Sequence, residues 1–108
     1  MAKHMQREIE KLKKQILSLG ALVEENLRSA VLAIEERDAD LAQRVIDGDV
    51  EVDQMEVDIE EECLKILALH QPVAVDLRFI VAVLKINNDL ERIADLAVNI
   101  AERAIFLA

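Results

Sequence analysis

The sequence predicts an all-α fold, an up-down-up antiparallel three-helix bundle with long helices, and three observations support it. Apolar residues recur every three to four positions through most of the 108 residues. Only two glycines and one proline interrupt the chain, which leaves little material for turns. The two breaks between the apolar repeats are short, and helices joined by very short turns run antiparallel. We therefore expect one domain over residues 1–108 with a single hydrophobic core.

The first helix is predicted over residues 6–36. Its apolar stripe repeats with a period close to 3.5 and comprises Met5, Ile9, Leu12, Ile16, Leu19, Val23, Leu27, Ala30 and Ile34. Gly20 interrupts this helix, at a cost of up to about 1 kcal/mol relative to alanine. Because Gly20 borders the stripe, we expect a neighbouring helix to approach closely there.

The second helix is predicted to start after Asp38, a residue type that favours the N-cap position, and to end near His70. Its apolar stripe includes Cys63, which we expect to be a small core residue rather than a reactive thiol. Beside the stripe lies a row of acids at helical spacing: Asp49, Asp53, Glu56 and Glu60.

The third helix is predicted over residues 72–107, with Pro72 in its first turn and Gln71 before it as a cap. The expected core stripe is Ile86, Leu90, Ile93, Ala97, Ile100 and Ala104. A polar face lies about half a turn away and contains Asn88, Glu91, Asp95, Asn99 and Glu102.

Short turns also predict which positions face each other. If His70 and Ala74 lie at the same height along the bundle axis, Asp53 lies opposite Glu91 and Asp49 lies opposite Asp95 in the middle of the bundle. Such acids either form solvated faces or bind a cation between the helices. Carboxylates without imidazole or thiolate partners favour hard ions such as Fe(III), Mn, Mg or Ca.

Charge and composition exclude several functions. With 13 basic and 22 acidic residues, the net charge of −9 disfavours nucleic acid and anionic membrane surfaces as partners. No segment has the pattern of a transmembrane helix or signal peptide, and we expect a cytoplasmic protein. No nucleophile–histidine–acid set or glycine-rich phosphate loop is present, so we do not expect an enzyme.

Two passages resemble the PhoU family of phosphate-uptake regulators. They are QPVAVDLR at 71–78 and the segment 89–102, which contains DLERIAD and NIAE. The resemblance extends over nearly the whole chain and implies a single PhoU-type three-helix repeat. It also implies that E(D)xxxD motifs hold a metal, which on this chain correspond to Asp49, Asp53, Glu91 and Asp95. The implied metal is iron, with manganese, magnesium or zinc as alternatives.

The chain departs from the family pattern at several positions. Val75 replaces a common serine in the turn motif, and Ala94 and Leu96 stand where glycine and often histidine flank Asp95. The family usually has two bundles in tandem, whereas this sequence holds one. Either the chain is a fragment or a homodimer restores the arrangement, with Ile80, Leu84 and Val98 as candidates for the dimer face.

The resemblance implies a cytoplasmic adaptor that regulates phosphate uptake and phosphate-responsive signalling. Its expected partners are the ATPase subunit of a phosphate ABC transporter and a phosphate-sensing histidine kinase, contacted through Asp76 and Arg78 of the turn motif. A structural ion pair is the alternative role for Arg78, as it is for Arg92. The alternative function is a metal-binding helical bundle with a structural or metal-sensing role unrelated to phosphate.

Overall fold

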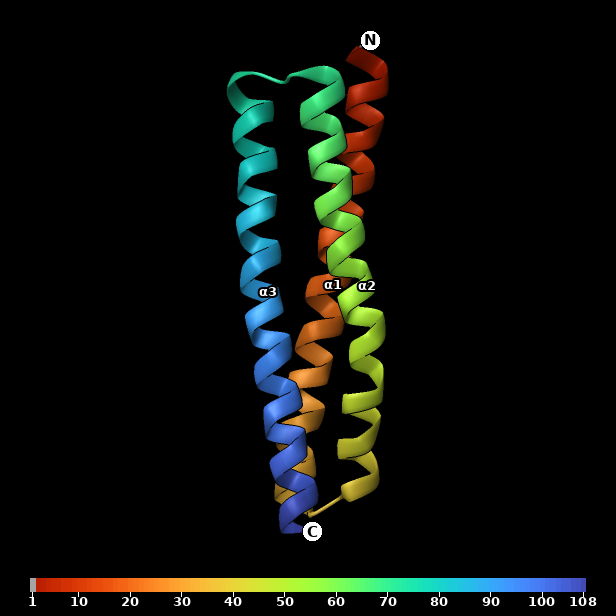
Figure 1. Cartoon of the computed structure of the whole chain (residues 1–108), viewed down its shortest axis with the longest axis vertical. Coiled ribbons are helices and arrows are strands. Elements are labelled where there is room, and N and C mark those ends of the chain that lie inside the picture. The colour runs from red at the N-terminus through yellow and green to blue at the C-terminus, as the bar shows by residue number, and fades with distance from the viewer. Residues whose placement is uncertain (1) are drawn as a thin grey trace.

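The computed structural model describes residues 2–108 and consists of three long helices (Figure 1). Helix α1 spans Ala2–Glu36, α2 spans Ala39–His70 and α3 spans Ala74–Leu107. Helices α1 and α3 run in the same direction and α2 runs against both, within a rod of 55 × 17 × 16 Å. The predicted up-down-up three-helix bundle is therefore confirmed.

The first turn has a C-cap and an N-cap in succession. Arg37 adopts a left-handed φ of 53°, and the Asp38 N–H donates to the Ala33 carbonyl at 2.9 Å. This pattern is a Schellman motif, formed here without glycine. The Asp38 carboxylate then accepts from the Leu41 N–H at 3.0 Å, which confirms the predicted N-cap of α2.

The second turn differs from the prediction. Gln71 is the left-handed C-cap of α2, with φ 44°, and does not cap the following helix. Val73 is the N-cap of α3, so Pro72 lies in the connection and not in the first helical turn. A residue before proline is disfavoured in the right-handed helical region, so the chain ends α2 at that point. It then uses the rigid Pro72 to cross to the next helix.

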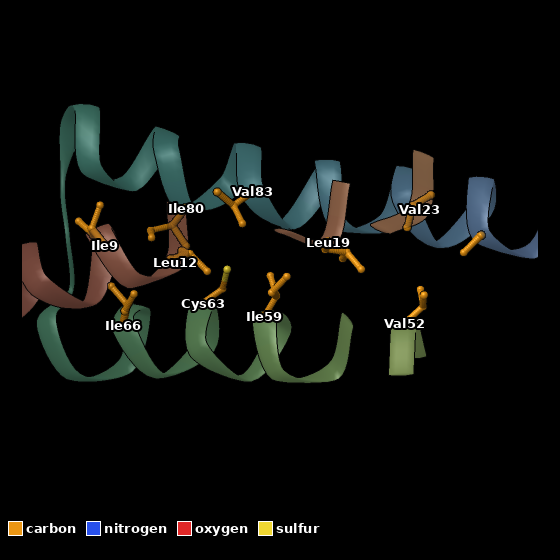
Figure 2. Packing of buried hydrophobic residues seen from close by; sticks show 11 residues of the cluster. Ile9, Leu12, Leu19, Val23, Val52, Ile59, Cys63, Ile66, Ile80 and Val83 are labelled. Carbon is orange, nitrogen blue, oxygen red and sulfur yellow. The ribbon is translucent and has the colours of Figure 1, made fainter. Parts of the chain in front are cut away.

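Large aliphatic side chains fill the bundle at the end where α2 joins α3. Figure 2 shows them converging from all three helices, and the fully buried ones are Leu12, Leu19, Val23, Val52, Ile59, Cys63, Ile66, Ile80 and Val83. Burial, with smaller contributions from Glu62 and Glu60, raises the pKa of the Cys63 thiol to about 11. The predicted role of Cys63 as a core residue is confirmed.

The opposite end of the core is built mainly from alanines. Its buried residues are Ala30, Ala33, Ala42, Val45, Ala97, Ala101 and Ala104. Larger side chains such as Leu27 and Ile34 pack against this cluster from its edges. The helices can therefore approach one another with small residues at their contact surfaces.

The predicted core stripe of α3 is confirmed in part, because four of its six residues are buried or pack against the core: Leu90, Ala97, Ile100 and Ala104. Ile86 and Ile93 are 45% and 37% exposed, whereas Asn87 and Ala94 are buried. Ile80 is also fully buried, so it does not belong to a dimer face. Leu84, the second residue of that predicted face, is partly buried and packs against the core, and Val98 is half-buried.

Gly20 also differs from expectation. A Cβ atom added at Gly20 would meet no heavy atom within 4 Å, so no helix of this chain approaches it closely. None of the helices within residues 2–108 combines the length and apolar content that crossing a membrane requires.

Candidate metal centre

Helices α2 and α3 together form an open cleft lined mostly by acids. Its volume is about 480 Å³, and its lining residues are Asp53, Glu56, Val57 and Glu60 of α2 and Asn87, Glu91 and Asp95 of α3. Three of the four residues predicted to bind metal therefore line one cleft. The fourth, Asp49, lies one turn before Asp53 on α2, half-buried.

The electrostatics place Asp49 in the same cluster. Burial raises its pKa, and the charges of Asp53 and Asp95 raise it further. Asp53, Glu91 and Asp95 thus line one cleft, and Asp49 lies near enough to feel the charges of Asp53 and Asp95.

Glu56 is the most strongly affected acid of the cluster. It is only 7% exposed, and its Oε1 atom has no hydrogen-bond partner among the described residues. Burial raises the pKa of Glu56 to about 7, with further increases from Glu91, Asp53, Asp49 and Asp95. The charges of four carboxylates thus disfavour ionisation of Glu56, which the sequence analysis placed only in the acidic row of α2.

Asn87 was not identified from the sequence. It is 4% exposed, and its Nδ2 donates to the backbone carbonyl of Glu56 at 3.0 Å. Its Oδ1 is buried and has no partner within residues 2–108. The sequence did hold a signal, because Asn87 repeats at seven-residue spacing with the buried Ile80, Ala94 and Ala101.

The donor set of this cleft consists of oxygen atoms alone, which suits a hard cation. In their present conformations, no three His, Cys, Asp or Glu side chains of the described residues are arranged to hold an ion. Neither histidine contributes. His4 is exposed on α1, and His70 Nε2 lies 3.2 Å from Glu8 Oε2 at the end of the bundle.

The residues predicted to contact partners lie apart from the cleft, in the first turns of α3. Asp76 is half-buried and Arg78 is exposed, with no ion pair to Arg78 among the described residues. Exposed Leu69, Val73 and Val75 accompany them at this end of the bundle. Arg92 does form a local pair, 3.9 Å from Asp89, and both side chains are exposed.

The fold is thus a slender three-helix bundle with an oxygen-rich cleft on one side. The model of the PhoU domain matches residues 16–104. The PhoU phosphate-specific transport accessory protein of Edwardsiella tarda is 46% identical over 98 residues, which cover 91% of this chain and 40% of the relative. The Aquifex aeolicus homologue is 47% identical over 102 residues, covering 94% and 46%.

A solved structure agrees with these relatives. The crystal structure of PhoU from Pseudomonas aeruginosa matches with a TM-score of 0.92 and 45% identity, over 94% of this chain and 49% of that one. The chain belongs to the PhoU family. The names of the relatives describe accessory proteins of a phosphate-specific transport system, which agrees with the expectation that this chain is not an enzyme.

The chain spans less than half the length of these relatives. More than half of each of them therefore lies outside the matched three-helix unit.

Proposed function

We propose that this chain is a cytoplasmic regulator of phosphate uptake and phosphate-responsive signalling, acting as a protein-binding adaptor. The observation that carries the proposal is the family match, since relatives with the same fold and 46–47% identity are named accessory proteins of phosphate-specific transport. The ATPase subunit of a phosphate transporter and a phosphate-sensing histidine kinase are the proposed partners.

The end of the bundle between α2 and α3 is the proposed contact surface. It presents exposed Leu69, Val73 and Val75 beside Asp76 and Arg78, and Arg78 forms no ion pair within residues 2–108. Apolar side chains flanked by charges are typical of interfaces, in which the charges select the partner and the apolar area stabilises the complex. The net charge of −9 favours encounter with basic surfaces, and salt weakens such steering.

A binding experiment tests this role. The purified chain is immobilised and exposed at low and high salt to the transporter ATPase subunit and to the kinase. We expect retention at low salt and its loss in Arg78→Glu. The control Arg103→Glu makes the same charge change near the other end of α3, and should leave binding unchanged. If neither protein is retained at low salt, the adaptor role is wrong.

We further propose that Asp49, Asp53, Glu91 and Asp95 hold a metal ion between α2 and α3. The oxygen-only donor set and the raised pKa of Asp49 support this, because clustered carboxylates repel one another unless a cation is close. Hard ions such as Fe(III), Mn²⁺, Mg²⁺ or Ca²⁺ suit such donors, and zinc fits less well because it favours nitrogen and sulfur ligands. The bound ion would supply positive charge that joins the two helices.

A structural or sensing role of the metal, unrelated to phosphate, is the second candidate function. The same cleft supports it, because an ion bound between α2 and α3 would stabilise the bundle whatever its partner is. Chelation distinguishes the two. If EDTA lowers the melting temperature but leaves partner binding intact, the metal has this separate role.

We also propose that the chain forms a homodimer, through a face different from the one predicted from the sequence. We call this the α1–α3 face and define it by Gly20, Leu27, Val31, Ile86 and Ile93. Lys13 of α1 lies 5.6 Å from the ring of Phe79 on α3. Positions 20 and 27 follow Lys13 at seven-residue spacing, as Ile86 and Ile93 follow Phe79, so the two rows run side by side along parallel helices.

The occupant we propose for the α1–α3 face is a second copy of this chain. Ile86, Ile93 and Val31 are exposed large apolar residues on it, and Gly20 leaves open space beside them. The relatives are more than twice as long as the matched unit, which supports pairing of two units.

A further inference from the structure

We propose that Glu56 is a further ligand of the metal between α2 and α3 and that Asn87 positions it. This inference rests on the metal site proposed above. It extends that site from the exposed or half-buried carboxylates of the two E(D)xxxD motifs to a buried carboxylate and a buried amide beside them.

The position of Glu56 is the first step of the argument. Glu56 follows Asp53 by three residues and precedes Glu60 by four, so the three side chains share one face of α2. All three line the cleft that Glu91 and Asp95 line from α3. Glu56 is the only one of these five acids that is buried, and its Oε1 has no partner among the described residues. A buried carboxylate without a partner is costly, and a cation in the cleft would supply one.

Asn87 provides a second and independent observation. Its amide nitrogen donates to the Glu56 carbonyl at 3.0 Å, which fixes the orientation of the amide because a carbonyl can only accept. The remaining atom, Oδ1, can only accept a hydrogen bond or bind a cation. It is buried without a partner among residues 2–108, and Asn87 lines the same cleft. Two buried oxygens thus lack a partner where the carboxylates gather.

A neutral Glu56 offers an alternative explanation. If its carboxyl kept a proton, the O–H group could donate to Asn87 Oδ1 and satisfy both atoms without a metal. Substitution by glutamine distinguishes the two explanations, because its amide reproduces the neutral acid in shape and donor capacity but has no charge for a cation.

The experiment measures Mn²⁺ binding to the intact chain by isothermal titration calorimetry, with melting curves in the presence of EDTA to verify folding. We expect the unmodified chain to bind Mn²⁺ and Glu56→Gln to bind it about tenfold or more weakly, while the EDTA-treated variant melts no lower than the unmodified chain.

Two glutamine variants serve as controls. Glu60→Gln removes a charge from the exposed rim of the same cleft. Glu62→Gln removes a carboxylate that is also buried, 8% exposed and with an unpartnered Oε1, but that lines a separate cleft with Lys11, Gln15 and Lys65. We expect Glu62→Gln to bind Mn²⁺ as the unmodified chain does, and Glu60→Gln to lose less affinity than Glu56→Gln.

Asn87 is tested by a double-mutant cycle. Asn87→Leu should weaken Mn²⁺ binding when Glu56 is present and change it little in the Glu56→Gln background, because Asn87 acts through Glu56. A purely structural role, or direct binding of the ion by Asn87 Oδ1, would give the same loss in both backgrounds, and that result would overturn the positioning role.

The remaining outcomes separate this inference from the proposed site. If the unmodified chain binds Mn²⁺ and Glu56→Gln binds it equally well, the role of Glu56 is wrong while the metal site stands. Equal losses in Glu56→Gln and Glu62→Gln would also overturn it, because the effect would then be one of overall charge. If the unmodified chain binds none of Mn²⁺, Fe(III) and Mg²⁺, both proposals fail.

Discussion

Glu56 combines burial with the repulsion of four neighbouring carboxylates, so the metal-free chain pays a free-energy penalty when this group ionises. In the folded chain its pKa is about 7, above the ordinary value of 4.5. Below that ordinary value the carboxyl is protonated in both states. As the pH rises toward 7, the folded chain keeps a proton that the unfolded chain has lost, so stability falls.

The first prediction follows from this fall in stability with rising pH. In EDTA, the free energy of unfolding should be higher at pH 5 than at pH 8, by at most about 3 kcal/mol for the full shift. Water at the open side of the cleft will lower this value. Urea unfolding at the two pH values measures it. Glu56→Gln should remove most of the difference, whereas Glu51→Gln, an exposed acid on α2, should retain it.

At the scale of the helix, α1 shows how position decides the contribution of one residue type. Leu19 is fully buried and packs against residues of α2 and α3, whereas Leu17, two positions earlier, is exposed. The two lie on opposite sides of the helix because two residues correspond to about 200° of rotation.

The second prediction compares these two leucines. Leu19→Ala should destabilise the chain by about 2–5 kcal/mol, since it removes buried methyl groups and leaves a cavity. Leu17→Ala should change the free energy of unfolding by less than about 0.5 kcal/mol. Chemical denaturation of both variants checks this. Similar losses of unfolding free energy in the two variants would contradict the finding that Leu19 is buried and Leu17 is exposed.

Gly20 gives a third prediction, also for α1. Because an added Cβ would meet nothing within 4 Å, Gly20→Ala should stabilise the isolated bundle by about 0.5–1 kcal/mol through its helix propensity. Gly48→Ala, on α2 and equally unobstructed, is the matched variant and should behave alike. Thermal unfolding at low protein concentration measures both, and a lower melting temperature in either would show a contact that the structure lacks.

Helix α3 shows what could and could not be read from the sequence. Helix number, direction and the Asp38 cap were predicted, because apolar period, short breaks and capping chemistry are local properties. The core stripe was predicted correctly at four of six positions, but Ile86 and Ile93 were assigned to the core in place of the less bulky Asn87 and Ala94, which are buried. A search for periodic apolar residues favours the bulkiest side chains. In the sequence, an exposed apolar stripe cannot be distinguished from a buried one.

The candidate site was predicted in part for a related reason. The four motif acids follow from helical spacing and from which positions the short turns bring to the same height, and three of them line one cleft in the structure. Glu56 was assigned to the acidic row but not to the buried interior, and Asn87 was missed. Both depend on the rotation of α3 against α2, which spacing along one helix does not determine.

At the scale of the whole molecule, the rod leaves many large apolar side chains in water, among them Val31, Ile86 and Ile93 of the α1–α3 face. The fourth prediction is that the chain forms a homodimer through this face. Light scattering after size-exclusion chromatography should give twice the mass of the 12.2 kDa chain at high concentration. Ile93→Glu should yield a monomer, because it places a charge in an apolar interface.

The control for the dimer is Leu64→Glu on α2, where the leucine is exposed but belongs to a helix outside the α1–α3 face. This variant should remain dimeric. A monomeric mass for the unmodified chain at every concentration would contradict the proposed dimer.

The two halves of the core differ in the apolar area they bury, and this has a consequence for local motion. Alanine buries far less apolar surface than leucine or isoleucine, so the end near the α1–α2 turn has less hydrophobic stabilisation than the end near Pro72. Amide hydrogen exchange should therefore be fastest around Ala42 and Ala101 and slowest around Leu12 and Ile66. The acidic cleft lies between these regions, so an ion bound there would slow exchange mainly in the alanine half.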